Sequence, residues 1–120
     1  MIFAIETEEQ TLHVFVNENA AVAYCEGLDV EAEIWQFWNA EGSPLEPKFT
    51  VQNKSGLFTV QNGKYHLVKA TENHHSSLLE ALEHVVAVEG LSPLNTVAAI
   101  RQCLTHPSSG TPCGAPYVKR

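Results

Sequence analysis

Short apolar stretches with a period of two residues dominate the first half of the chain. Ile2–Ile5 and Thr11–Val16 flank the polar segment 6–10, and apolar residues recur at every other position of the second stretch. Such alternation is typical of strands with one buried face, so residues 1–16 predict a β-hairpin. A short helix is expected directly after it, because Asn17 is a favourable N-cap residue and Gly27 is suited to end a helix in a left-handed conformation.

An aromatic strand is expected in the middle of the chain. Ile34–Trp38 is dense in strand-forming residues, and Trp35 and Trp38 would point to opposite faces of the sheet. If helices cover only one face of that sheet, one of the two tryptophans stays partly open to solvent. Pro44 and Pro47 restrict the next strand to a sheet edge or a loop.

A second hairpin is expected around a two-residue turn. Leu57–Gln61 and Lys64–Lys69 have the composition of strands and flank Asn62-Gly63. A type I′ turn needs positive φ at both central residues, and Asn-Gly is the pair that adopts it most readily. The pattern therefore predicts that these two stretches pair with each other.

The last third of the chain has helical periodicity. Ser77 and Glu80 form a capping-box pattern ahead of apolar residues at helical spacing, and Gly90 would end this helix. Ser92-Pro93 is expected to start a second helix, which would end at His106-Pro107.

Together these elements predict one α+β domain over residues 1–107. Its sheet is expected to be largely antiparallel, with about five to six strands, one short helix inserted after the first hairpin, and two C-terminal helices packed on one face. A length of 120 residues with 44% hydrophobic content suits a single core. Residues 108–120 are expected to form an extended tail that packs on the domain or on a partner.

Charge is distributed unevenly along the chain. Residues 1–47 hold ten of the 14 acidic residues and no Lys or Arg, whereas residues 48–120 hold four acidic residues and all seven basic ones. Nucleic-acid binding requires clustered Lys and Arg, so the net charge of -7 argues against it. A basic protein is the better expected partner, and the oligomeric state stays open.

The sequence also predicts a cytoplasmic location. No apolar stretch approaches the length of a membrane span, and the residues after Met1 lack the basic region of a secretory signal, so no membrane association is expected. Cys25, Cys103 and Cys113 are odd in number and widely spaced, which fits neither a disulfide framework nor a zinc site. Reduced, free thiols are therefore expected.

No residue pattern indicates catalysis. Ser76, His75 and Asp29 could be combined into a hydrolase triad, but the sequence has no G-x-S-x-G motif around the serine. His74 and His75 lack partners at the spacing of metal ligands. We therefore expect no catalytic residue, no metal ligand and no cofactor.

A partner-binding surface is instead expected around the aromatic strand. Trp is enriched at the centres of protein interfaces, and acidic residues bracket the strand on both sides. Acidic residues at the rim of such a surface would speed association with a basic protein. The residues expected to bind the partner are Glu26, Asp29, Glu31, Glu33, Trp35, Trp38 and Glu41.

Two segments, 23–31 and 41–47, carry a resemblance to known proteins. They read AYCEGLDVE and EGSPLEP, and they are similar to segments of the small acidic immunity proteins with which bacteria neutralise toxins of contact-dependent and type VI delivery systems. The resemblance implies a cytoplasmic inhibitor that binds a toxin domain, such as a nuclease, and has no chemistry of its own. Two alternatives remain open: a small enzyme or ligand-binding domain that uses His74 and His75, and an adaptor module of a secretion or regulatory complex.

Overall fold

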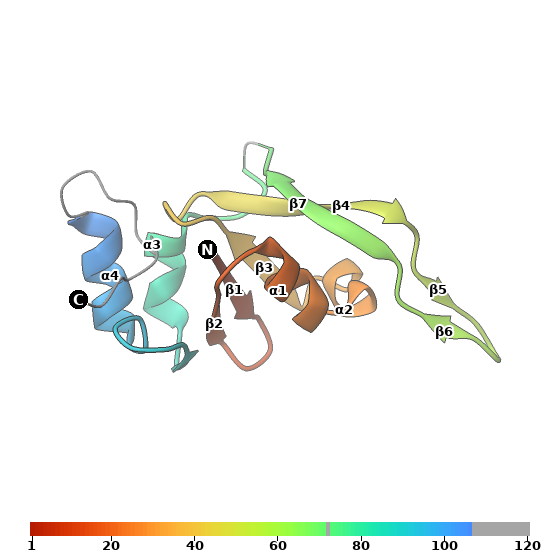
Figure 1. Cartoon of the computed structure of the whole chain (residues 1–120), viewed down its shortest axis with the longest axis horizontal. Helices are drawn as coiled ribbons and strands as arrows, with labels where there is room; N and C mark the ends of the chain where they lie inside the picture. Colours follow the sequence, from red (N-terminus) through yellow and green to blue (C-terminus); the bar gives the residue numbers. More distant parts are fainter. Residues whose placement is uncertain (72, 107–120) are drawn as a thin grey trace.

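A six-stranded mixed sheet forms the centre of the molecule in a computed structural model, which describes residues 1–71 and 73–106 (Figure 1). The strand order is β7-β4-β3-β1-β2-β8. The strands are β1 (Ile2–Glu6), β2 (Thr11–Phe15), β3 (Trp35–Trp38), β4 (Pro44–Val51), β7 (Lys64–Lys69) and β8 (Ala87–Glu89). All neighbouring pairs are antiparallel except β2 and β8, which confirms the predicted α+β class and the largely antiparallel sheet. The predicted tail, residues 108–120, lies outside the described residues.

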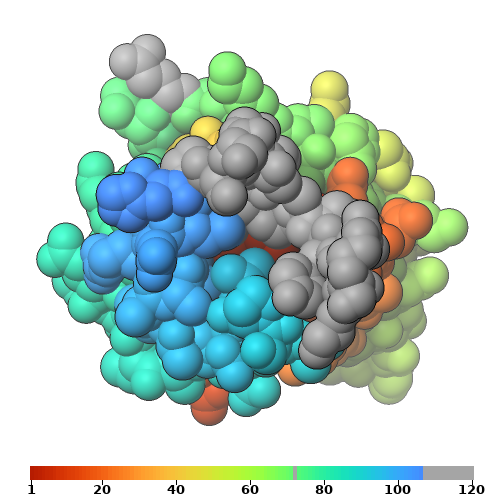
Figure 2. All heavy atoms as spheres, turned by 60° about the vertical axis from the view of Figure 1, so that its left-hand side comes forward, coloured from red at the N-terminus to blue at the C-terminus, as the bar shows by residue number. Residues whose placement is uncertain are grey.

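Helices cover both faces of the sheet rather than one. On the first face, α3 (Leu78–Ala81), the 3-10 turn η1 (Leu82–His84) and α4 (Val97–Thr105) pack against the sheet. Figure 2 shows this side, where α4 in blue lies beside the teal and cyan residues that precede it. The core of this face consists of Phe3, Ile5, Leu12, Trp38, Leu78, Leu82 and Ile100.

The second face is covered by α1 (Glu18–Tyr24) and α2 (Gly27–Glu31). Its core consists of Ile2, Ala4, Ala21, Cys25, Val30, Phe37 and Tyr65. The Tyr65 hydroxyl donates to the carbonyl oxygen of Cys25 over 2.6 Å, which fixes the end of α1 against β7. Because each strand contributes alternate residues to the two cores, both sides of the sheet are buried over its centre.

Local capping signals in the sequence identify two helix starts correctly. Asn17 Oδ1 accepts a hydrogen bond from Ala20 N over 2.8 Å at the start of α1, and Ser77 Oγ accepts from Glu80 N over 3.3 Å at the start of α3. The expected helix stop is wrong, however, because α1 already ends at Tyr24 and Gly27 begins α2.

The first predicted C-terminal helix is much shorter than its apolar periodicity indicates. After η1, Val85 is extended (φ -76°, ψ 130°), and the chain runs on into β8, parallel to β2. The backbone of Val86 donates to the carbonyl oxygen of Gln10 over 2.9 Å. The edge of β2 therefore offers this segment hydrogen bonds that an isolated helix pattern does not reveal, and its β-branched valines suit a strand.

The predicted hairpin around Asn62-Gly63 is also wrong. Residues 64–69 pair with β4, while β5 (Lys54–Ser55) and β6 (Val60–Gln61) form a separate two-stranded arm whose turn lies at residues 56–59. Gly63 is needed for a close backbone approach instead, since a Cβ there would overlap the carbonyl oxygen of Val51. The arm projects beyond the end of the sheet that is remote from α3 and α4 (Figure 1).

β4 is neither the edge strand nor the loop that its prolines predict, because it pairs with both β7 and β3. The prolines nevertheless limit its pairing with β3. Leu67 N donates to Glu18 Oε2 over 2.7 Å, so the backbone amide of Leu67 points away from β4. Leu67 lies opposite Pro47 of β4, and these two residues therefore form a non-hydrogen-bonded pair. The nitrogen of Pro47 therefore faces the β3 side, where it has no hydrogen to donate. Pairing between β3 and β4 accordingly stops at Leu45.

The cysteines differ from one another in state. Cys25 is a free, fully buried thiol, and burial, reinforced by nearby Asp29, raises its pKa to about 12. Cys103 on α4 is disulfide-bonded, so the expectation that all cysteines stay reduced is wrong; Cys113 lies outside the described residues. A disulfide is more typical of an oxidising compartment, which weighs against the predicted cytoplasmic location. Among the described residues, no helix is long and apolar enough to cross a membrane.

Candidate protein-binding surface

The two tryptophans of β3 have different environments. Trp38 is fully buried, and its indole Nε1 donates to the carbonyl oxygen of Ser76 over 2.7 Å. Trp35 is half-buried on the opposite face of the sheet. Trp38 therefore belongs to the core and cannot contact a partner, whereas solvent reaches Trp35.

Glu26 and Glu31 take part in an intramolecular clamp. Asn62 Nδ2 donates to Glu26 Oε2 over 2.9 Å, and Asn53 Nδ2 donates to Glu31 Oε1 over 2.8 Å. The same asparagines also bind the backbone of α2, at Leu28 N (2.9 Å) and at the carbonyl oxygen of Gly27 (2.9 Å) respectively. These two carboxylates therefore hold the base of the arm against α2, although both residues remain exposed.

The other three predicted acidic residues do not form one rim. Glu33 is exposed, lies two residues before Trp35 and has a left-handed backbone conformation (φ 64°). Asp29 belongs to α2 and lies near the thiol of Cys25. Glu41 lies in the turn after β3, at the far end of this strand from Trp35. Of the predicted partner-binding set, Glu33 is thus the acidic residue that neighbours the accessible tryptophan most directly in sequence.

Four aromatic side chains gather on the face of the sheet that carries α1. This aromatic patch consists of His13, Phe15, Tyr24 and Trp35. The His13 ring centroid lies 5.3 Å from that of Tyr24 and 5.1 Å from that of Trp35, and the Phe15 and Tyr24 centroids are 5.6 Å apart. These distances mean that the rings pack against one another and leave no cage between them.

Tyr24 is the most accessible member of the aromatic patch. It is 58% exposed, whereas His13, Phe15 and Trp35 are half-buried. Strands β2 and β3 hold three of the rings, and α1 lays Tyr24 over them. The result is a platform in which the exposed ring of Tyr24 is supported by contacts with three other rings.

The electrostatic surroundings of the aromatic patch are acidic. Burial lowers the pKa of His13, and the nearby carboxylates of Glu89, Glu6 and Glu9 oppose this shift only in part. A neutral imidazole therefore lies among three negative groups at neutral pH. A basic partner would find complementary charge at this surface.

Sequence reasoning missed most of this surface. No sequence pattern gives Tyr24 a role. In β2 the alternation of apolar residues identifies Leu12 and Val14 as core residues and leaves His13 and Phe15 on the other face. A usable signal exists nevertheless: Leu12 and Val14 fill the opposite face of β2, so the aromatic pair His13 and Phe15 had to share a face with each other. Glu89 could not be found, because residues 87–89 were expected to be helical.

The histidine pair lies beside Trp38, on the other face of the sheet, and is engaged internally. Nδ1 of His74 lies 2.7 Å from Nδ1 of His75, Nε2 of His75 lies 3.0 Å from the carbonyl oxygen of Phe37, and Nε2 of His74 lies 3.7 Å from Glu46 Oε2. Within residues 1–71 and 73–106, no group of three or more His, Cys, Asp or Glu side chains could hold a metal ion. The absence of metals and cofactors stays a prediction for the whole chain.

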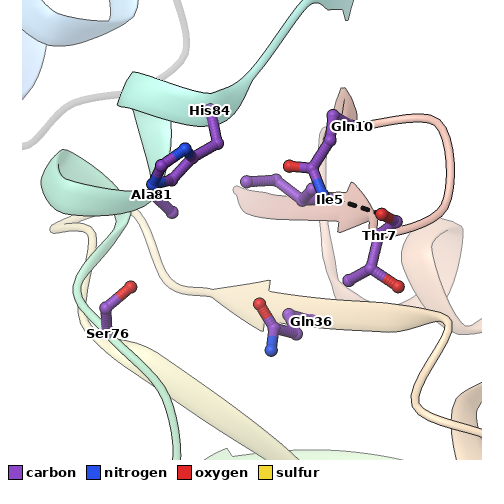
Figure 3. A pocket seen from close by; sticks show the side chains of 7 residues that line it. All are labelled: Ile5, Thr7, Gln10, Gln36, Ser76, Ala81 and His84. Atoms are coloured by element: carbon purple, nitrogen blue, oxygen red, sulfur yellow. Dashed lines mark hydrogen bonds between the residues drawn. The ribbon is translucent and has the colours of Figure 1, made fainter.

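A pocket of about 560 Å³ opens near the start of α3 (Figure 3). It is lined by Ile5, Thr7, Gln10, Gln36, Ser76, Ala81 and His84. Gln10 Nε2 donates to the carbonyl oxygen of Thr7 over 2.7 Å at its rim. These seven residues include amides, hydroxyls and one imidazole but no carboxylate, Lys or Arg, so the pocket offers hydrogen bonds without a charged group to polarise a bound molecule.

Comparisons with protein-family models, with curated proteins and with solved structures find no match to this chain. The function is therefore inferred from the residues and their geometry.

Proposed function

We propose that this chain is an inhibitor that binds a basic partner protein through the aromatic patch. The partner we propose is a bacterial toxin domain, because the resemblance of segments 23–31 and 41–47 to immunity proteins implies one. The observation that carries the proposal is Tyr24, which is 58% exposed on top of three packed rings. Tyr and Trp are the residue types enriched at interface hot spots, and a side chain that is ordered before binding costs little entropy to bury.

The acidic residues around the aromatic patch support a basic partner. Glu6, Glu9 and Glu89 are close enough to His13 to influence its protonation. Charges of one sign around an aromatic centre raise the association rate with an oppositely charged protein and disfavour acidic competitors. In this arrangement the rings supply the affinity and the carboxylates supply the steering.

Photo-crosslinking tests the proposal in two steps. A photoreactive amino acid replaces Tyr24 in one preparation and Leu91, which is 84% exposed but not part of the aromatic patch, in the matched control. In a lysate of the native host, the position-24 probe should capture a basic protein domain that the position-91 probe does not. Equal capture by both probes, or capture of no basic protein but of an acidic protein other than a second copy of this chain, would contradict the proposed surface.

Inhibition is then tested with the captured domain. Its expression alone should arrest cell growth, and co-expression of the wild-type chain should restore growth. Tyr24→Ala should weaken binding by about 2 kcal/mol or more and reduce this protection. If the captured domain is harmless by itself, the chain is an adaptor module and the inhibitor proposal is wrong.

A further inference from the structure

The β5–β6 arm has an apolar tip that no described residue covers. Every residue of 54–61 is exposed, and the tip residues Leu57 and Phe58 are 90% and 94% exposed. Val60, just after the tip, is 72% exposed. Large apolar side chains at such exposure mark an interaction site when they are adjacent, since isolated ones are common but contiguous ones are not.

The turn chemistry of the arm supports a binding role for its tip. Gly56 N donates to the carbonyl oxygen of Thr59 over 2.7 Å, so Leu57 and Phe58 are the two loop residues of this hairpin. Two-residue loops favour Gly, Asn or Asp at these positions, and neither Leu57 nor Phe58 adopts a positive φ. Leu57 and Phe58 therefore depart from the usual turn composition at exposed positions where they do not stabilise the fold. Such departures are expected where residues serve a function.

The β4–β7 ribbon with its arm is basic, whereas the surroundings of the aromatic patch are acidic. Of the five Lys and Arg residues in the described ranges, four lie on the arm or on the β4–β7 ribbon that bears it: Lys48, Lys54, Lys64 and Lys69. Among the described acidic residues, only Glu46 lies on this ribbon. The aromatic patch, by contrast, is surrounded by Glu6, Glu9 and Glu89. One chain therefore presents an apolar tip on a basic ribbon and an acidic, aromatic platform.

We propose that the tip of the arm binds the aromatic patch of a second copy of this chain. The arm cannot serve its own patch, because Asn53 and Asn62 clamp its base to α2 and it points away from the body (Figure 1). In a two-fold dimer each copy inserts Leu57 and Phe58 against Tyr24 of the other, so the contact is made twice. Lys54 then lies near the acidic residues of the partner copy.

The dimer gives the proposed function a regulatory step. In this respect the inference rests on the proposed function, since the arm of the second copy and the basic partner would occupy the same patch. Binding of the partner and dimerisation would exclude each other, and the free protein would shield its aromatic surface until the partner competes for it. The dimer itself requires no partner, so it can be tested on the purified chain alone.

Sedimentation of the purified full-length chain tests dimerisation. The wild type should dimerise, and Leu57→Ser with Phe58→Ser should raise the dimer Kd by about thirtyfold or more, as expected for the loss of hot-spot residues. Tyr24→Lys should have a similar effect, and salt of about 1 M should weaken the wild-type dimer. Leu91→Ser is the matched control for an exposed apolar residue and should leave the Kd unchanged. Melting temperatures confirm that each variant is folded.

A photoreactive amino acid at position 58 locates the contact. In an equal mixture of isotopically light and heavy protein, crosslinks should join different copies and map to residues 13–15, 24 or 35. A monomeric wild type at about 100 μM, an unchanged dimer in the Leu57→Ser/Phe58→Ser variant, or crosslinks that map elsewhere would each overturn the proposal. None of these outcomes bears on partner capture at position 24, so the two proposals fail separately.

Discussion

The Nδ1 atoms of His74 and His75 lie 2.7 Å apart, so one ring must donate a hydrogen and the other must accept it. Nε2 of His75 lies 3.0 Å from the carbonyl oxygen of Phe37, which only accepts. Neutral His75 therefore donates from Nε2 and accepts at Nδ1, and His74 donates from its own Nδ1. Protonation of His75 would reverse this bond: His75 would donate from Nδ1, and His74 would accept there and carry its own hydrogen on Nε2, which faces Glu46.

Stability should fall as the pH drops below about 6.5, the ordinary pKa of His, because burial disfavours the charged form of His75 in the folded chain. Burial lowers the pKa of His75 and is the largest effect. The hydrogen bond to the Phe37 carbonyl oxygen opposes this shift in part, and the smaller effects of His74 and Glu46 act in opposite directions. The unfolded chain then takes up a proton before the folded chain does, so this contribution is present above pH 6.5 and is lost as pH falls through the folded pKa. Urea unfolding at several pH values between about 7 and 5 measures the effect.

The variant His75→Gln isolates this contribution. It should be less stable than the wild type near neutral pH but should lose less stability on acidification. His66→Gln, at an exposed position of β7, is the matched control and should keep the wild-type profile. A wild-type pH profile in His75→Gln would show that another group controls acid stability.

Gly63→Ala should destabilise the protein strongly. A Cβ at this position would overlap the Val51 carbonyl oxygen and lie 2.8 Å from Asn53 N, both of them backbone atoms that cannot rotate away. We expect a loss of about 2 kcal/mol or more in the free energy of unfolding. Gly56→Ala is the control, because its Cβ would meet its nearest neighbour, the carbonyl oxygen of Thr59, at an ordinary 3.8 Å. Similar melting temperatures for the two variants would contradict this account.

The Asn62-Gly63 pair shows where prediction from the sequence fails, in contrast to the elements that it identifies correctly. Alternation and capping are local signals, so the first hairpin, the strand at Trp35–Trp38 and the caps at Asn17 and Ser77 were predictable. Asn62-Gly63 has equally clear local chemistry, yet its asparagine binds α2 and its glycine admits the Val51 carbonyl. A signal of turn formation and a signal of close tertiary approach look the same in one sequence.

The candidate site was predictable only in part for a related reason. Alternation places Trp35 and Trp38 on opposite faces of the sheet, but it does not reveal which of the two tryptophans the helices cover completely. Tyr24 joins Trp35 only through tertiary packing across α1, β2 and β3. Likewise, the exposure of Leu57 and Phe58 depends on where the turn of the arm falls, which the Asn62-Gly63 pair concealed.

Alkylation should distinguish the cysteines in the folded and unfolded states. Cys25 is fully buried, and its pKa is raised to about 12, so it should resist iodoacetamide in the native protein and react once the chain is unfolded. Cys103 should react only after reduction, because it is disulfide-bonded. Peptide mass spectrometry of samples unfolded with and without reductant measures both. Labelling of Cys103 without reductant would show a reduced thiol and would support the predicted cytoplasmic location.

The buried thiol of Cys25 should also make the stability of the fold sensitive to alkaline pH. The folded-state pKa of Cys25 lies above the ordinary value of 9.0, so its contribution is complete below pH 9 and is lost as pH rises toward about 12. At pH 10 the loss should be about 1 kcal/mol. Cys25→Ala removes this contribution and should flatten the alkaline limb of the stability profile, while the raised pKa of Tyr65 leaves part of it in place. An alkaline limb identical to that of the wild type would exclude Cys25 as its source.

Charge reversal at Glu31 and Glu33 should affect stability unequally, although the sequence assigned both to one binding surface. Glu31 accepts a hydrogen bond from Asn53 Nδ2 over 2.8 Å, and a lysine cannot accept it. Glu31→Lys should therefore cost about 1 kcal/mol and loosen the clamp that orients the arm. Glu33→Lys is the matched control, since its exposed side chain makes no hydrogen bond within the described residues and should change stability by only a few tenths of a kcal/mol. Thermal unfolding of the two variants measures the difference, and equal losses would show that the clamp contributes nothing. With unequal losses, weaker dimerisation in Glu31→Lys would report on the arm, and weaker partner binding in Glu33→Lys would report on charge at the aromatic patch.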